Sequence, residues 1–160
     1  MHNTRNDLPE KTRSQMVDLL NGRLADAIDL ATQTKHAHWN VKGPNFFQLH
    51  ELFDKINEDV LEYVDEIAER AVQLGGTAMG TARVAAQRST LKEYPLDKIA
   101  GRDHVEALTA ALAAFGKGVR AAIEAAAEAR DADTADLFTE VSRGVDKWLW
   151  FVEAHLQSEK

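Results

Sequence analysis

The sequence predicts an all-α protein, a bundle of four long helices with a long crossover between the second and the third. Apolar residues recur three to four positions apart in four long blocks, which is the spacing of a helix with one buried face. Breaker residues separate the blocks, and one separation is much longer than the others. The sequence contains no alternating strand pattern, internal repeat or low-complexity segment, so residues 1–160 are expected to form a single domain.

The first two predicted helices fill the N-terminal half. The first block ends before the breaker pair Gly43-Pro44. We expect it to begin near Pro9, which suits a first helical turn, with Asp7 as its cap. The second block occupies about residues 45–74 and stops at Gly75-Gly76.

The second half holds two more helices, predicted at about residues 102–130 and 134–157. The turn at residues 131–133 separates them and offers a helix cap. Short connections make the first and second helices antiparallel neighbours, and likewise the third and fourth. The connection at residues 75–101 is long enough to run along the bundle, and we expect a short helix in it at residues 81–89. Four long helices with one long middle crossover are the ferritin-like arrangement.

Composition limits the kinds of function. The chain has no cysteine, so any metal must be held by His, Asp and Glu, and the reducing cytoplasm is the expected location. The net charge of −7 argues against a surface built for nucleic acid and suits a protein that attracts cations, although simple solubility explains it as well. No stretch is long and apolar enough to span a membrane. The polar residues 1–8 do not resemble a signal peptide and are expected to form a flexible tail.

Four potential metal ligands share one stripe of the predicted second helix. At about 100° per residue, with His50 set to zero, Asp54 falls at about 40°, Asp65 at about 60° and Glu69 at about 100°. His50 and Asp54 are four residues apart, as are Asp65 and Glu69, so each pair can face a common ion. His38 lies at the end of the preceding helix, where it can lean toward the start of this one.

The two pairs cannot hold one ion within a single chain. At a rise of about 1.5 Å per residue, their centres lie about 22 Å apart along the helix, whereas metal–ligand bonds are about 2.0–2.2 Å long. Either each pair binds its own ion, or each pair is completed by a second chain. An antiparallel copy of the helix, related by a twofold axis near Asp59, brings the first pair of one chain opposite the second pair of the other and creates two equivalent sites.

Other interpretations apply to the same residues. A charged pair four residues apart is most often a solvated helix face. Di-iron proteins that hold the metal inside one bundle use Glu-x-x-His pairs, and this sequence contains none. The segment HELFD at residues 50–54 looks like a zinc-protease motif with its second His replaced by Asp, but no third ligand is evident downstream.

Longer stretches of the sequence resemble a known family. The chain closely resembles the Dps family, the DNA-binding proteins from starved cells or miniferritins, in KHAHWN at 35–40, GPNF at 43–46, HELFD at 50–54, DEIAERAVQLGG at 65–76 and DKWLWF at 146–151. The likeness covers nearly the whole chain, and the combination of motifs is highly specific.

The resemblance implies a hollow homododecamer of four-helix bundles with ferroxidase centres at its twofold interfaces. By the family pattern, one chain supplies His38, His50 and Asp54 and its partner supplies Asp65 and Glu69, all of which match here. The family oxidises Fe(II), typically with hydrogen peroxide rather than oxygen, and stores Fe(III) oxide in the cavity, which protects against oxidative damage. Carboxylate and imidazole ligands suit iron, and the affinity order of divalent metals lets zinc compete.

The resemblance also bears on residues outside the ligand set. Trp39, beside the first ligand, either takes up an oxidising equivalent near the metal or anchors the core or an interface. In the family, acidic residues at the third turn line threefold pores that admit iron, which implies such a role for Asp131, Asp133, Asp136 and Glu140. Capping and solvation of the helix start explain the same acidic residues equally well.

Some family members also compact DNA, often through a Lys-rich disordered tail, so a nucleoid protein is the alternative function. Here the N-terminal segment mixes basic with acidic residues, and the other end offers only Lys160 after Glu159. A dodecamer would carry twelve times the net charge of −7. Strong DNA binding is therefore not expected, because phosphate binding needs clustered Lys and Arg.

Overall fold

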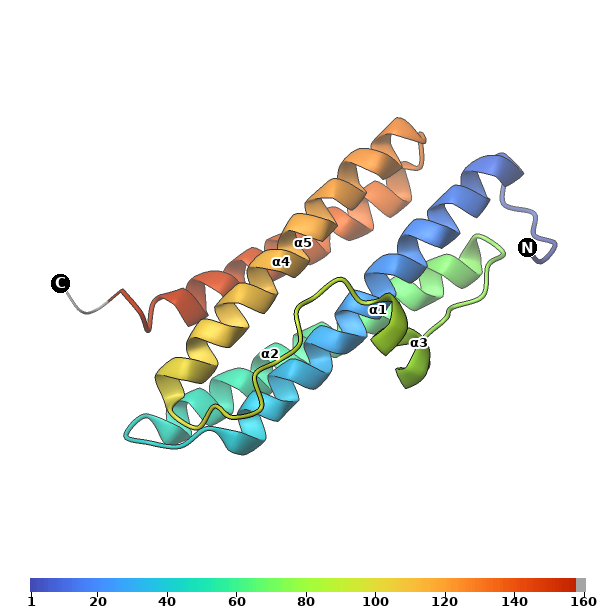
Figure 1. Cartoon of the computed structure of the whole chain (residues 1–160). Coiled ribbons are helices and arrows are strands. Elements are labelled where there is room, and N and C mark those ends of the chain that lie inside the picture. Colours follow the sequence, from blue (N-terminus) through green and yellow to red (C-terminus); the bar gives the residue numbers. More distant parts are fainter. Residues whose placement is uncertain (158–160) are drawn as a thin grey trace.

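Four long helices and one short helix make up the chain in a computed structural model, which describes residues 1–157 (Figure 1). Over this range the structure contains no β-strand, only an isolated bridge between Lys42 and Ala100. None of the helices described is long and apolar enough to cross a membrane. Lys160, the one basic residue expected at the C-terminal end, lies outside the described range. The predicted all-α class is confirmed by α1 (Glu10–Asn40), α2 (Phe46–Gln73), α3 (Ala82–Arg88), α4 (Gly101–Glu128) and α5 (Ala132–Glu153).

Two helix starts differ from the sequence prediction. Pro9 itself is the residue that caps α1, and no side chain bonds the helix start, so Asp7 is not the cap. Asp7 lies two residues too early to reach the first free N–H groups of the helix. Helix α5 begins at Ala132, two residues before the predicted start, because the Asp131 carboxylate accepts a hydrogen bond from the backbone N–H of Thr134 at 3.1 Å.

The long helices pair as two antiparallel hairpins, α1 with α2 and α4 with α5. The hairpins pack together through α1 on α4 and α2 on α5, and the crossover runs back along the bundle so that α4 starts at the same end as α2 (Figure 1). The apolar faces of all four helices meet in one core. Its largest fully buried apolar side chains are Phe53, Phe115, Phe138, Leu20, Leu24, Leu30, Ile56, Ile67, Leu74, Leu108 and Leu112.

Polar side chains of α1 hold the crossover in place. Asn21 donates a hydrogen bond to the carbonyl of Thr77 at 3.0 Å. The carboxylate of Asp26 accepts one from the backbone N–H of Thr90 at 2.6 Å, and Gln33 donates to a crossover carbonyl at 3.1 Å. These contacts fix the segment that contains α3 against α1 (Figure 1).

Candidate metal centre

The end of α1 and the start of α2 bring three of the predicted ligands together. The short loop at residues 41–45 reverses the chain, so His38 on α1 lies beside His50 and Asp54 on α2. The imidazole rings of His38 and His50 stack with their centroids 3.7 Å apart. Nδ1 of His38 lies 2.8 Å from the carbonyl oxygen of His50, and Nδ1 of His50 lies 2.9 Å from the carbonyl oxygen of His38.

This reciprocal pair of hydrogen bonds decides how each ring can act. A backbone carbonyl only accepts, so Nδ1 of both His38 and His50 must carry the proton and donate it. In the neutral ring Nε2 then keeps its lone pair. Metal-binding histidines are oriented in the same way, by a hydrogen bond from the ring nitrogen that does not bind the metal. Each histidine is therefore prepared to bind a cation through Nε2.

Asp54 completes this group. Its Oδ1 lies 3.8 Å from Nδ1 of His38 and accepts a hydrogen bond from the ammonium of Lys35. The hydrogen bond from Lys35 lowers the pKa of Asp54 most. Burial acts in the opposite direction, while the charges of His38, Lys35 and His50 lower the pKa further. The carboxylate is therefore ionised at neutral pH, which is the state that binds metal.

The structure keeps Asp65 and Glu69 away from these three residues. They lie beyond the middle of α2, which is one uninterrupted helix, and both side chains are exposed. Within residues 1–157 of one chain, no three His, Asp or Glu side chains are arranged to hold a metal ion. One chain thus presents two separated parts of the predicted ligand set, one with three residues and one with two.

Trp39 follows His38 on α1 but points away from the core. Its side chain is 68 % exposed, so the expectation that it anchors the core of the chain is wrong. The indole borders two surface hollows beside α1. Its other predicted roles, at an interface or as an electron donor, remain predictions.

The predicted pore residues divide into two groups. Asp131 is buried, accepts a hydrogen bond from Arg70 at 2.8 Å and caps α5, so its carboxylate does not fit a pore lining. Asp136 and Glu140 are exposed on α5 and border a hollow of about 260 Å³ that also includes Glu69. The negative charges of the acidic residues around this hollow act on one another, as the pKa of one of them shows.

Glu66, which also borders this hollow, shows the effect of that crowding. Burial raises the pKa of Glu66 most, and the negative charge of Glu140 raises it further, followed by those of Glu62 and Asp65. The neighbouring negative charges favour the protonated form of the carboxyl group. For the same reason they favour a cation bound nearby. The face between α2 and α5 is therefore electrostatically suited to positive ions.

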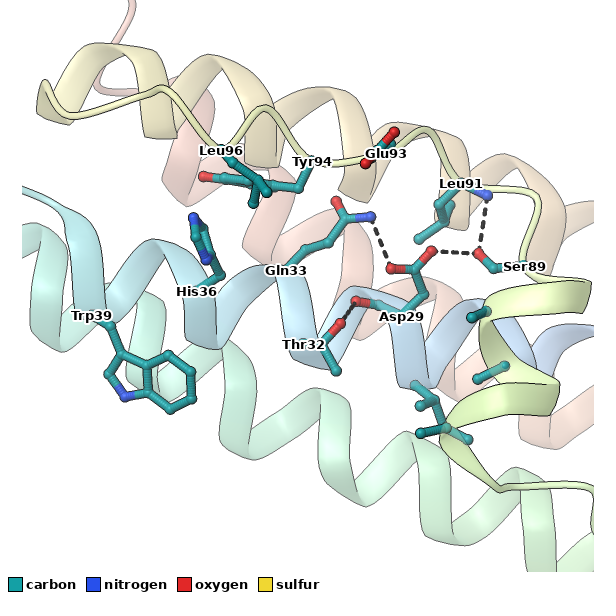
Figure 2. Close-up of a pocket in the computed structure, with 14 residues that line it drawn as sticks. Asp29, Thr32, Gln33, His36, Trp39, Ser89, Leu91, Glu93, Tyr94 and Leu96 are labelled. Atoms are coloured by element: carbon teal, nitrogen blue, oxygen red, sulfur yellow. Dashed lines mark hydrogen bonds between the residues drawn. The ribbon is translucent and has the colours of Figure 1, made fainter.

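A hollow of about 710 Å³ lies between α1 and the crossover and does not include the predicted ligands (Figure 2). Three of its polar side chains are bonded to one another. The carboxylate of Asp29 accepts hydrogen bonds from Gln33 at 3.1 Å and from Ser89 at 2.6 Å. Figure 2 shows the crossover residues Tyr94 and Ser89 lying over the α1 side chains. These contacts attach the crossover to α1.

Sequence reasoning missed Lys35, which bonds the predicted ligand Asp54. A signal was available, because Lys35 precedes His38 by three residues and therefore lies on the same face of α1. The contact itself depends on how α1 and α2 pack, which the spacing within one helix does not give.

Comparison with known proteins identifies the family of the chain. The ferritin-like domain of the Ferritin family matches residues 17–160. The DNA protection during starvation protein of Agrobacterium fabrum is 46 % identical over 158 residues, covering 99 % of this chain and 98 % of that protein. This chain belongs to the Dps family of ferritin-like proteins. A second Dps relative, the DNA protection during starvation protein of Mycolicibacterium smegmatis, is 39 % identical over 155 residues and covers 94 % of this chain and 82 % of that protein.

Solved Dps structures have the same fold. Mycobacterium smegmatis Dps superposes with a TM-score of 0.94 at 34 % identity, over 99 % of this chain and 96 % of that one. Vibrio cholerae Dps superposes with a TM-score of 0.91 at 28 % identity, over 98 % of both chains, and is described as a member of a broad superfamily of ferritin-like diiron-carboxylate proteins. The Dps resemblance and the ferritin-like bundle with a crossover helix are both confirmed.

Proposed function

We propose that this Dps family member is a ferroxidase and iron-storage protein. It oxidises Fe(II), preferentially with hydrogen peroxide, at sites shared by two chains, and it stores Fe(III) mineral inside a hollow homododecamer. The observation that carries the proposal is the divided ligand set: His38, His50 and Asp54 lie together, while Asp65 and Glu69 are exposed farther along the same straight helix. A twofold axis near the middle of α2 joins the two parts of the set.

The surface around the middle of α2 supports a second chain at this position. Trp39 is 68 % exposed and Leu61 is 51 % exposed. They border a hollow of about 370 Å³ between α1 and α2, whose lining is almost entirely apolar. Exposed apolar surface of this kind is stabilised when a partner covers it. An antiparallel α2 from a second copy would cover it and bring Asp65 and Glu69 to the histidines.

The ligand chemistry suits iron oxidation. Each completed site has two imidazoles and three carboxylates, and the carboxylates favour Fe(III) over Fe(II) because they are hard, negatively charged ligands. Each Fe(II) gives up one electron, so two Fe(II) ions reduce one molecule of hydrogen peroxide. The O–O bond breaks, and two protons complete two molecules of water. Iron reaches the cavity through threefold pores, where exposed Asp136 and Glu140 attract the cation.

DNA packing is the weaker alternative. The curated relatives carry names that refer to DNA protection. In this chain the guanidinium of Arg13, one of the few basic groups near the N-terminus, donates hydrogen bonds to the carbonyls of Leu8 and Leu74 at 3.1 and 3.0 Å. A guanidinium held in this way contributes less to phosphate binding, and the chain carries a net charge of −7.

The proposal is tested by replacing one ligand from each part of the set. We expect Asp54→Asn and Glu69→Gln each to slow the initial rate of Fe(II) oxidation by peroxide by at least about tenfold, because losing even a group that only orients a metal ligand costs about that much. Native mass spectrometry should give a dodecamer for both variants. Glu124→Gln, which removes an exposed carboxylate from α4, is the matched control and should oxidise iron at the native rate. Native rates in both ligand variants would refute the proposed site.

A further inference from the structure

The hollow between α1 and the crossover has the size and the lining of a small-molecule site. Its volume of about 710 Å³ lies within the usual range of ligand pockets. Much of its wall is apolar and includes the rings of Trp39 and Tyr94 and the side chains of Leu91 and Leu96. The Leu96 side chain is 72 % exposed, so the wall of the hollow presents apolar surface that a bound molecule would cover.

The charged groups of this hollow are all negative. The carboxylate of Asp29 accepts hydrogen bonds only from the neutral side chains of Gln33 and Ser89, one at each oxygen, so each oxygen can accept another. Glu93 adds a second carboxylate from the crossover. Neither carboxylate forms an ion pair within residues 1–157, and no Lys or Arg lines the hollow. A positively charged group is therefore attracted to it.

His36 contributes a buried hydrogen-bond donor to the same hollow. The side-chain amide nitrogen of Asn40 donates to the carbonyl of His36 at 2.8 Å and lies 3.4 Å from Nδ1 of the ring. Nδ1 therefore accepts, and Nε2 carries the proton. Nε2 is buried and has no hydrogen-bond partner among the described residues. An oxygen atom of a bound molecule would supply the missing acceptor and remove the cost of an unpaired donor.

The spacing of these groups defines the molecule that fits. Asp29 and His36 are seven residues apart, which places them on one face of α1, about 10 Å apart along its axis. Figure 2 shows both on α1, with Tyr94 across the hollow on the crossover. A ligand that reaches both ends needs a cation at one end, an oxygen at the other and a flat apolar body between them, packed against the Tyr94 ring.

We propose that this hollow binds a small amine with an aromatic body and an oxygen acceptor at its far end. The ammonium binds the carboxylates of Asp29 and Glu93, and the oxygen accepts a hydrogen bond from Nε2 of His36. The hollow contains none of the proposed metal ligands, so the site goes beyond the proposed function and does not depend on it.

The test is a calorimetric titration of the assembled protein with three related probes. Tyramine carries the ammonium, the ring and the phenolic oxygen. In tyrosol a hydroxyl replaces the ammonium, and phenethylamine lacks the phenolic oxygen. We expect tyramine to bind about tenfold more tightly than tyrosol, because hydrogen bonds to a charged group contribute about that factor, and about fivefold more tightly than phenethylamine, which loses one neutral hydrogen bond.

Asp29→Asn tests the carboxylate without detaching the crossover. The amide oxygen can accept from Gln33 while the amide nitrogen donates to the hydroxyl of Ser89, so both hydrogen bonds of the native residue are kept. We expect this variant to bind tyramine at least about fivefold more weakly and tyrosol as the native protein does. Asp18→Asn removes an exposed carboxylate from α1 outside the hollow and should bind tyramine with native affinity.

Three results would overturn the proposal. Tyramine that does not bind the assembled protein would show that the hollow is closed, as it would be if a second copy filled it. Equal affinity for tyramine and tyrosol, or native affinity for tyramine in Asp29→Asn, would show that the carboxylates do not select a cation. Equal affinity for tyramine and phenethylamine would overturn the assignment of the ligand oxygen to His36.

Discussion

A single buried histidine connects the stability of this protein to pH. His104 is fully buried near the start of α4, and the hydroxyl of Tyr94 lies 2.7 Å from its Nδ1. Burial lowers the pKa of His104 most, and the neighbouring His36 lowers it further, while Asp103 and a backbone contact with Asn40 act in the opposite direction. Burial also raises the pKa of Tyr94, so its hydroxyl stays protonated. His104 is thus neutral in the folded chain.

The lowered pKa predicts a loss of stability in acid. Below about pH 6.5, the ordinary value for histidine, the unfolded chain takes up a proton at this position before the folded chain does. The stability that neutral, buried His104 contributes to the folded chain is therefore fully present above about pH 6.5. It is lost as the pH falls, by up to about 1.4 kcal/mol per pH unit. We expect His104→Gln to lose less unfolding free energy than the native protein between pH 7.5 and 5.5, measured by urea unfolding at one protein concentration.

The exposed His155 supplies the control for this experiment. His155→Gln should keep the acid sensitivity of the native protein, because it leaves the buried His104 in place. Equal acid sensitivity of His104→Gln and the native protein would show that His104 does not cause the loss.

For the predicted ligands, the sequence could predict relations within one helix but not contacts between helices. Spacing along one helix predicted that His50 shares a stripe with Asp54, because the helical period fixes that relation. The stacking of His38 on His50 and the ion pair of Lys35 with Asp54 depend on the distance and rotation between two helices, which the period of neither helix contains. The resemblance implied a pore-lining role for Asp131, but its carboxylate caps α5, as the turn at residues 131–133 suggested, and pairs with Arg70 in the interior.

At the scale of elements, the crossover is held by charged and polar groups rather than by a large apolar face. Asp26 is fully buried, and its carboxylate accepts hydrogen bonds from the backbone N–H of Thr90 at 2.6 Å and from its hydroxyl at 3.1 Å. Arg23 balances its charge at 2.9 Å. A buried carboxylate with this many donors is stabilising only while the set is complete.

Removal of the Asp26 carboxylate should therefore release the crossover. We expect Asp26→Ala to lower the free energy of unfolding by about 3 kcal/mol, because it leaves buried donors unsatisfied and a guanidinium unpaired. Urea unfolding measures the loss, and limited proteolysis should cut first within residues 77–92. Asp18→Ala removes an exposed carboxylate from the same helix and is the control. The account of the crossover is wrong if the two variants are equally stable.

Element boundaries were largely predictable, and the exceptions have physical causes. The apolar period and the breakers predicted α2 at residues 45–74 and the crossover helix at 81–89, within one residue of Phe46–Gln73 and Ala82–Arg88. The cap of α1 was wrong because Pro9 stands directly before the first helical residue, which leaves Asp7 two residues too far from the free N–H groups of the first turn. The hydrogen bonds that hold the crossover against α1 could not be predicted, because they join residues about 60 positions apart in the sequence.

At the scale of the whole molecule, the divided ligand set is the central feature. A straight helix of 28 residues cannot bend its two halves onto one ion. In the proposed assembly, the same helix of an antiparallel copy would supply the missing ligands without any change in the fold of either chain. Assembly and chemistry are therefore linked in the proposed account, because no single chain holds a complete site.

Mixed assemblies of two inactive variants test this claim most directly. One variant carries His50→Ala with Asp54→Asn, and the other carries Asp65→Asn with Glu69→Gln. Each alone has only defective sites. In a one-to-one mixture of chains refolded together, random pairing restores about a quarter of the sites to the native ligand set. We predict that Fe(II) oxidation by peroxide returns to about a quarter of the native rate. A mixture as inactive as its two components, at the same state of assembly, would contradict a site shared between chains.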